Sequence, residues 1–308
     1  MRLTLFVLLL CLSAVTAAAL PTVQSGTLQR LENFTSAFVP SRHIDIWLPP
    51  QFKAGNAYPV IYMHDGQMLF DAATTWNNQE WQVDEVAGTL IQQQAISPFI
   101  VVAIWNGGEN RHSEYFPQKP FSAMPEPLQQ QLYQAKRGEN QRLFTQPVYS
   151  DAYLKFIVTE LMPVIETKYR VKADSSYLMG SSMGGLISWY GLLEYPDKFA
   201  GAACLSTHWP GDFTAENNPV PAYFQQYIKQ NINKLTKQKL YFDYGTATLD
   251  AWYPPLQSKI DNLLTHSYPM QFWTSKLFTG ADHSESAWAA RLDQPLLFLL
   301  SENKLPAY

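Results

Sequence analysis

Short apolar runs rich in valine, isoleucine and aromatic residues recur along the chain. Runs of this length and composition are typical of buried β-strands. The predicted strands cover residues 44–48, 60–63, 99–104, 177–179, 199–205, 240–244 and 272–278. Apolar residues spaced three or four positions apart predict helices at 153–169, 186–194, 256–266 and 285–300.

The order of these elements predicts the fold class. Strands and helices alternate in the later part of the chain, as in a largely parallel sheet with helices on both faces. No helix separates the first two strands, so we expect an antiparallel N-terminal edge. The 308 residues, 46% of them hydrophobic, suit a single α/β domain with a substantial core.

Two stretches interrupt this alternation. Residues 117–149 are rich in proline and glutamine and show no strand pattern, so they form either a cap over the site or a surface insertion. Residues 210–238 follow the predicted strand 199–205. This second stretch should therefore emerge at the carboxyl edge of the sheet, where open α/β folds bind ligands.

The first 19 residues have the features of a signal peptide. Arg2 precedes an apolar stretch that ends in the small residues Ala17-Ala18-Ala19, which suit cleavage. The stretch is shorter than the roughly 20 apolar residues needed to cross a bilayer. We therefore expect a secreted or periplasmic domain, residues 20–308, with no stable membrane insertion after cleavage.

Charge and cysteine content narrow the function classes. The net charge of −4 argues against nucleic-acid binding. Removal of the leader leaves Cys204 as the single cysteine, so no internal disulfide is expected. Histidine and acidic residues form no pattern typical of a metal site, and we expect neither a metal nor another cofactor.

The segment Gly180-Ser181-Ser182-Met183-Gly184 matches the Gly-x-Ser-x-Gly pattern of a nucleophilic serine. It lies between a predicted strand and a predicted helix, which is the context that this pattern requires. An abrupt turn from strand to helix leaves no room for side chains at the two glycines. Ser182 is the candidate nucleophile rather than Ser181, because only Ser182 has glycine two positions away on both sides.

The chain resembles the esterase family of α/β-hydrolases that includes feruloyl, acetyl-xylan and siderophore esterases, S-formylglutathione hydrolases and mycolyltransferases. The resemblance rests on the nucleophile segment and on three other segments, in the family's order. These are Tyr62-Met63-His64-Asp65-Gly66-Gln67, Asn106 with Arg111 and Glu114-Tyr115, and Gly280-Ala281-Asp282-His283. It implies an α/β-hydrolase fold and ester chemistry at a serine.

The serine needs a base, and imidazole suits that role near neutral pH. In α/β-hydrolases the histidine follows the nucleophile and the acid in the chain, on a loop after the last strand. His283 fits this position. His266 falls inside a predicted helix, and His208 comes too early in the chain.

The acid that orients the imidazole should follow the penultimate strand. Asp250 lies in the loop beyond Gly245, where the resembled family has its acid, and is the assigned residue. Asp243, inside the predicted strand, is the main alternative, and Asp282 is a weaker one.

An oxyanion hole needs two donors. One should be the backbone N–H of Met183, directly after the nucleophile. The resemblance implies the backbone N–H of Gln67 as the second, with Gly66 allowing a close approach of the chain.

Substrate contacts are predicted at three side chains. Trp209 is the tryptophan expected to line the site, and Asp65 and Arg111 could bind polar substrate groups or pair with each other. The expected activity is hydrolysis of a carboxylic ester, on a small molecule, carbohydrate or siderophore. Acyl transfer of the mycolyltransferase kind, peptidase or thioesterase action and a non-catalytic binding role are the alternatives.

The leader gives the first testable prediction. When the full chain is expressed in a host with a secretory pathway, the mature protein should begin near residues 17–20. N-terminal sequencing of the exported protein measures this. A mature sequence that begins at Met1 would contradict the assignment.

Overall fold

The computed structural model describes residues 19–138 and 141–301. Apart from Ala19, the predicted signal peptide lies outside these residues. Within the described ranges, no helix has both the length and the apolar character needed to span a bilayer.

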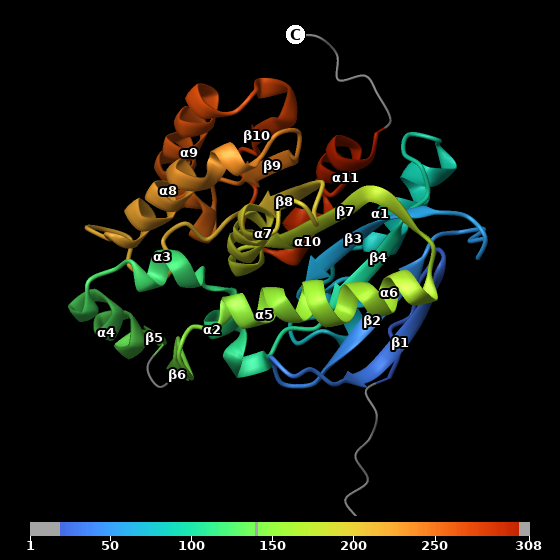
Figure 1. Cartoon of the computed structure of the whole chain (residues 1–308), viewed down its shortest axis with the longest axis horizontal. Coiled ribbons are helices and arrows are strands. Elements are labelled where there is room, and N and C mark those ends of the chain that lie inside the picture. The colour runs from blue at the N-terminus through green and yellow to red at the C-terminus, as the bar shows by residue number, and fades with distance from the viewer. Residues whose placement is uncertain (1–18, 139–140, 302–308) are drawn as a thin grey trace, which may run out of the picture.

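Eight strands form one sheet in the order β1-β2-β4-β3-β7-β8-β9-β10 (Figure 1). The pairs β1–β2 and β2–β4 are antiparallel, and all other neighbours are parallel. The mostly parallel sheet with an antiparallel N-terminal edge is as predicted. The strands are β1 (Thr27–Phe34), β2 (Arg42–Leu48), β3 (Tyr58–His64), β4 (Ile100–Ile104), β7 (Val171–Ser181), β8 (Gly201–Leu205), β9 (Lys239–Tyr244) and β10 (Trp273–Leu277).

Helices cover both faces of this sheet. Alternate residues of a strand point to opposite faces, so Val102 of β4 packs in one apolar core and Val101 in the other. The first core includes α5 to α9, and the second includes α1, α10 and α11. These helices are α1 (Val83–Gln92), α5 (Ser150–Phe156), α6 (Met162–Lys168), α7 (Met183–Glu194), α8 (Val220–Asn231), α9 (Pro254–Ser267), α10 (Glu285–Ala289) and α11 (Asp293–Leu300).

The predicted helix 153–169 corresponds to α5 and α6, joined by a π-helical turn at Ile157–Leu161. Figure 1 shows them as one long helix across a face of the sheet. The predicted helix 285–300 is instead broken between α10 and α11. Pro295 explains the break, because proline lacks an N–H and its ring clashes with the carbonyl four residues earlier.

Two strands differ from the sequence prediction. The edge strand β1 was not predicted, because its sequence TLQRLENF is polar and no residue in it is fully buried. Strand β7 was predicted only at 177–179, although it begins at Val171. Its first residues are mostly exposed and polar, so they carry no strand-like apolar pattern.

The insertion 117–149 contains two short helices and a hairpin. It contains α3 (Gln118–Ser122) and α4 (Glu126–Gln134), followed by a small hairpin of β5 (Lys136–Arg137) and β6 (Gln141–Arg142) that was not predicted. Helix α3 packs against α8, which belongs to the second insertion. Figure 1 shows the first insertion at one end of the molecule, beside α2 (Arg111–Tyr115) and α8.

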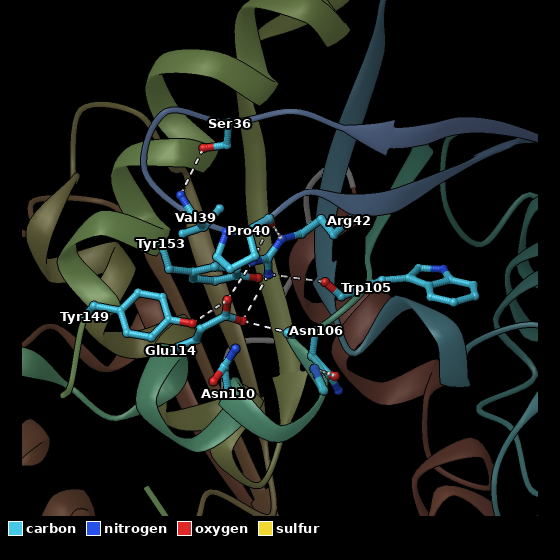
Figure 2. Close-up of polar contacts among 12 residues, drawn as sticks. Ser36, Val39, Pro40, Arg42, Trp105, Asn106, Asn110, Glu114, Tyr149 and Tyr153 are labelled. Carbon is cyan, nitrogen blue, oxygen red and sulfur yellow. Dashed lines mark hydrogen bonds and ion pairs between the residues drawn. The ribbon is translucent and has the colours of Figure 1, made fainter. Parts of the chain in front are cut away.

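A buried ion pair fixes the loop that follows β4. The Arg42 guanidinium donates to both carboxylate oxygens of Glu114, at 3.0 and 2.5 Å. The Tyr149 hydroxyl and the Gly107 backbone N–H also donate to this carboxylate, at 2.9 and 3.0 Å. Figure 2 shows Glu114 lying between Arg42 and Tyr149. Both oxygens of the carboxylate are therefore engaged, and the chain from Gly107 to Glu114 is held in place.

Replacing Glu114 by glutamine should destabilise the protein. The change leaves the Arg42 guanidinium as a buried charge without its partner, which costs about 3 kcal/mol in comparable pairs. Urea unfolding measures the loss in the free energy of unfolding. Glu109→Gln, an exposed change in the same loop, should stay within about 0.5 kcal/mol of the wild type. Equal stability of the two variants would contradict this account.

Candidate active site

Ser182 occupies a sharp turn between β7 and α7. Its backbone has φ 55° and ψ −119°, a strained conformation for a residue other than glycine. A Cβ atom at Gly180 would lie 2.8 Å from the backbone of Gly184, so the two glycines allow the chain to fold back on itself. The Ser182 N–H donates to the Leu205 carbonyl at the end of β8, at 2.9 Å. The turn is therefore held against the neighbouring strand.

The two serines of this segment differ in exposure. Ser181 is the last residue of β7 and is 3% exposed. Ser182 is partly exposed and directly precedes α7, near the positive end of that helix. Of the two, Ser182 is thus the one that a ligand can reach.

His283 and Asp250 form a hydrogen-bonded pair. His283 lies between β10 and α10, and its Nδ1 is 2.6 Å from Oδ1 of Asp250. The Asp250 side chain is fully buried, whereas the His283 ring is 15% exposed. An ionised carboxylate can only accept, so Nδ1 carries the proton and Nε2 of the neutral ring is free to accept one. Ser182, Asp250 and His283 follow parallel strands β7, β9 and β10, so all three lie toward the same edge of the sheet.

The other two candidate histidines have different surroundings. The His208 ring is buried, with Nδ1 2.9 Å from the Tyr253 hydroxyl. Burial, helped by the nearby His112 and His283, lowers the pKa of His208 well below its usual value. His266 is exposed on α9, and its Nδ1 lies 2.8 Å from the Asn262 carbonyl of the same helix. Within the described part of the chain, neither ring is paired with a carboxylate.

The alternative acids are also engaged elsewhere. Asp243 accepts from Nε and Nη2 of Arg291, at 3.1 and 3.0 Å, and from the Tyr241 hydroxyl, at 3.0 Å. Asp282 accepts from the Ser284 hydroxyl at 2.5 Å. Neither of these carboxylates bonds to His283 among the described contacts.

The Asp65-Gly66-Gln67 turn follows β3 directly. Asp65 has a left-handed backbone, and a Cβ atom at Gly66 would lie 2.5 Å from the Ala103 backbone. Gly66 therefore allows the close approach that the sequence suggested. Gln67 and Met183 both stand at the beginning of a helix, where a backbone N–H has no acceptor within the helix.

Asp65 pairs with Arg111 in the structure. Nε and Nη2 of Arg111 donate to its two carboxylate oxygens at 2.6 and 2.7 Å, and Asn106 donates to the first oxygen at 2.7 Å. Burial opposes ionisation of Asp65, but these donors hold its pKa below the usual value. Both oxygens are occupied, so Asp65 anchors the turn, whereas Arg111 keeps 27% of its side chain exposed.

Trp209 does not line an accessible site, which corrects the sequence expectation. It is 1% exposed, donates to the Gln257 side chain at 2.7 Å and stacks on Trp189 in the core. A tryptophan after a buried strand has no sequence signal that separates core from surface. Two aromatic side chains that do reach solvent are Trp76, 78% exposed, and Phe213, 42% exposed.

Both of these exposed aromatics are linked to the candidate residues through neighbouring residues. Trp76 precedes Asn77, whose amide donates to Glu285 two residues after His283, at 2.8 Å. Phe213 packs against the His208 ring, with the ring centroids 5.5 Å apart. Trp209 was preferred to Trp76, and Phe213 was missed, because exposure depends on loop packing, which short sequence patterns do not record.

Both curated proteins and solved structures include proteins similar to this chain. The chain is 27% identical to the ferri-bacillibactin esterase BesA of Bacillus subtilis over 198 residues, which is 61% of each protein. Its matches span about 60% of the length of the curated relatives. Among solved structures, the BES protein from Bacillus cereus has a TM-score of 0.65 and 16% identity, covering 92% of this chain and 100% of that one. The enterobactin esterase FES from Shigella flexneri has a TM-score of 0.58 and 17% identity, covering 91% of this chain and 60% of that one.

These structural neighbours share the α/β-hydrolase fold that the sheet order already indicates. The model of the family described as "Putative esterase" matches residues 35–299, nearly the whole of the described chain. The chain therefore belongs to this esterase family of the α/β-hydrolases.

Proposed function

We propose that this protein is an exported serine esterase that hydrolyses a carboxylic ester through an acyl-enzyme intermediate. The observation that carries the proposal is the 2.6 Å hydrogen bond from His283 to the buried Asp250, at the edge of the sheet where Ser182 is presented. A buried carboxylate that orients an imidazole, at the same sheet edge as a strained serine turn, is the arrangement expected for activating a hydroxyl nucleophile.

The proposed reaction begins with attack of the Ser182 Oγ on the ester carbonyl carbon, while Nε2 of His283 takes the hydroxyl proton. The N–H groups of Met183 and Gln67 stabilise the resulting oxyanion. The intermediate then releases the alcohol, which receives the proton from His283. Water attacks the acyl-enzyme with the same base, and the carboxylic acid leaves as Ser182 regains its proton.

The proposed substrate is an ester with an aromatic or carbohydrate part, such as a siderophore ester. BesA is named as a ferri-bacillibactin esterase and FES as an enterobactin esterase, which supports this substrate class. The exposed rings of Trp76 and Phe213 offer surfaces on which an aryl group or sugar could stack. The partly exposed Arg111 offers a donor for a polar substituent.

Ser182→Ala should abolish hydrolysis across a panel of aryl, acetyl and feruloyl esters. Loss of the nucleophile removes the acyl-enzyme route and costs about 10⁶ in kcat in a comparable hydrolase. Ser181→Ala serves as the matched control, because it removes the neighbouring hydroxyl and should retain turnover within about tenfold. Near-normal turnover in Ser182→Ala would refute the mechanism.

Asp250→Asn and Asp243→Asn should separate the two acids. The amide introduced by Asp250→Asn would favour the wrong imidazole tautomer, so turnover should fall by about 10⁴ while the melting temperature changes little. Asp243→Asn removes the charged partner of the buried Arg291, so it should act mainly on stability, with a much smaller fall in turnover than Asp250→Asn. Measuring kcat beside thermal unfolding distinguishes the effects. If Asp243→Asn abolished turnover in a folded protein while Asp250→Asn remained active, the assignment would be reversed.

A further inference from the structure

Ser206 is a buried polar residue that no motif in the sequence singles out. It directly follows β8 and is fully buried. Its backbone has φ 42°, in the left-handed region, and its N–H donates to the Asp243 carbonyl at 2.8 Å. This unusual backbone turns its side chain away from the regular path of the strand, toward the acid of the proposed triad.

The Ser206 hydroxyl has three hydrogen-bond partners. Its oxygen lies 2.5 Å from Oδ2 of Asp250, 2.8 Å from Nη2 of Arg291 and 3.0 Å from Nε1 of Trp288. Guanidinium and indole N–H groups can only donate, so they occupy the two lone pairs of the hydroxyl oxygen. The single hydroxyl hydrogen is left for Asp250, which as a carboxylate can only accept.

We infer that Ser206 is a positioning residue for Asp250, with the direction of its hydrogen bond set by Arg291 and Trp288. This inference rests on the proposed function. The Ser206 hydroxyl and the Gly245 N–H both donate to Oδ2 of Asp250, at 2.5 and 2.6 Å. With this oxygen held, Oδ1 faces Nδ1 of His283, and the carboxylate cannot rotate away from the ring.

Arg291 can serve as an orienting donor because its charge is matched elsewhere. Asp243 accepts from its Nε and Nη2 at 3.1 and 3.0 Å, within a fully buried setting. The guanidinium therefore does not compete with His283 for Asp250. Asp243, the acid that the sequence left as an alternative, supports the site through this pair.

Trp288 connects the same network to the base. Its ring packs edge-on against the His283 ring, with centroids 5.0 Å apart and planes at 84°. Trp288 lies in α10 and Arg291, three residues later, in the turn before α11, and both donate to the Ser206 hydroxyl.

The test compares Ser206→Ala and Ser206→Gly with the wild type. Both variants lack the hydroxyl, and glycine also relieves the positive φ, so it offers a second variant if alanine impairs folding. Turnover is expressed per active site, counted by complete reaction with a fluorophosphonate probe. We expect kcat to fall about 10- to 100-fold in both variants, with KM within about twofold, as for loss of one hydrogen bond to a charged group.

Ser150→Ala is the matched control. Ser150 is also fully buried, and its hydroxyl accepts from the Gln118 N–H at 2.9 Å, away from Asp250. This variant should keep kcat within about twofold. A loss in the Ser206 variants that is confined to the number of titrated sites, with normal turnover at each, would overturn the positioning role.

A double-mutant cycle with Asp250→Asn tests whether Ser206 acts through Asp250. If it does, Ser206→Ala should lower kcat little further in the Asp250→Asn background. Independent, multiplicative losses would overturn the inference.

If the Ser206 variants stay fully active while Ser182→Ala is inactive, only this inference fails. If the wild-type protein hydrolyses no ester in the panel, the proposed function fails and the inference falls with it.

Discussion

The turn at Ser182 is the constraint on which the rest of the site depends. A residue other than glycine at this backbone conformation persists only where its surroundings hold it. Here the Ser182 N–H donates to Leu205 and the Ser182 carbonyl accepts from the His208 N–H, at 2.9 and 3.1 Å. The end of β8 and the loop after it therefore clamp the turn from both sides. The same loop contains Ser206, so one short segment both holds the Ser182 turn and contacts Asp250.

Arginine–carboxylate pairs hold the loops around this turn. Arg42 with Glu114 fixes the loop after β4, Arg111 with Asp65 fixes the turn after β3, and Arg291 with Asp243 lies behind Asp250. Burying an ion pair adds little net stability, because desolvation offsets the attraction between the charges. A guanidinium that contacts a carboxylate through two N–H groups does fix the orientation of both side chains, however. Fixed orientation is what preorganised donors and acids require. These pairs thus orient the loops more than they stabilise the fold.

Much of the fold could be predicted from local patterns. Strands buried on both faces appear as apolar runs, and β2, β3, β4, β8 and β9 were each located to within about two residues. The partly exposed edge strand β10 was located equally well. The polar edge strand β1 and the polar start of β7 were missed, because a strand that faces solvent has no apolar pattern to detect. The hairpin β5–β6 is too short to leave a signal. The break before α11 comes from Pro295, which the prediction from apolar spacing did not take into account.

The sequence by itself determined the class of the fold, the strand–turn–helix at Ser182 and the positions of His283 and Asp250 relative to the last strands. It could do so because each of these depends on neighbours within a few residues, such as the glycines at 180 and 184. Only the tertiary structure decided that Trp209 is a core residue and that Asp65 and Arg111 pair with each other. It also decided that the Ser206 hydroxyl donates to Asp250 while it accepts from Arg291 and Trp288. Those outcomes join residues from separate strands and helices, and burial and hydrogen-bond direction exist only once these elements pack together.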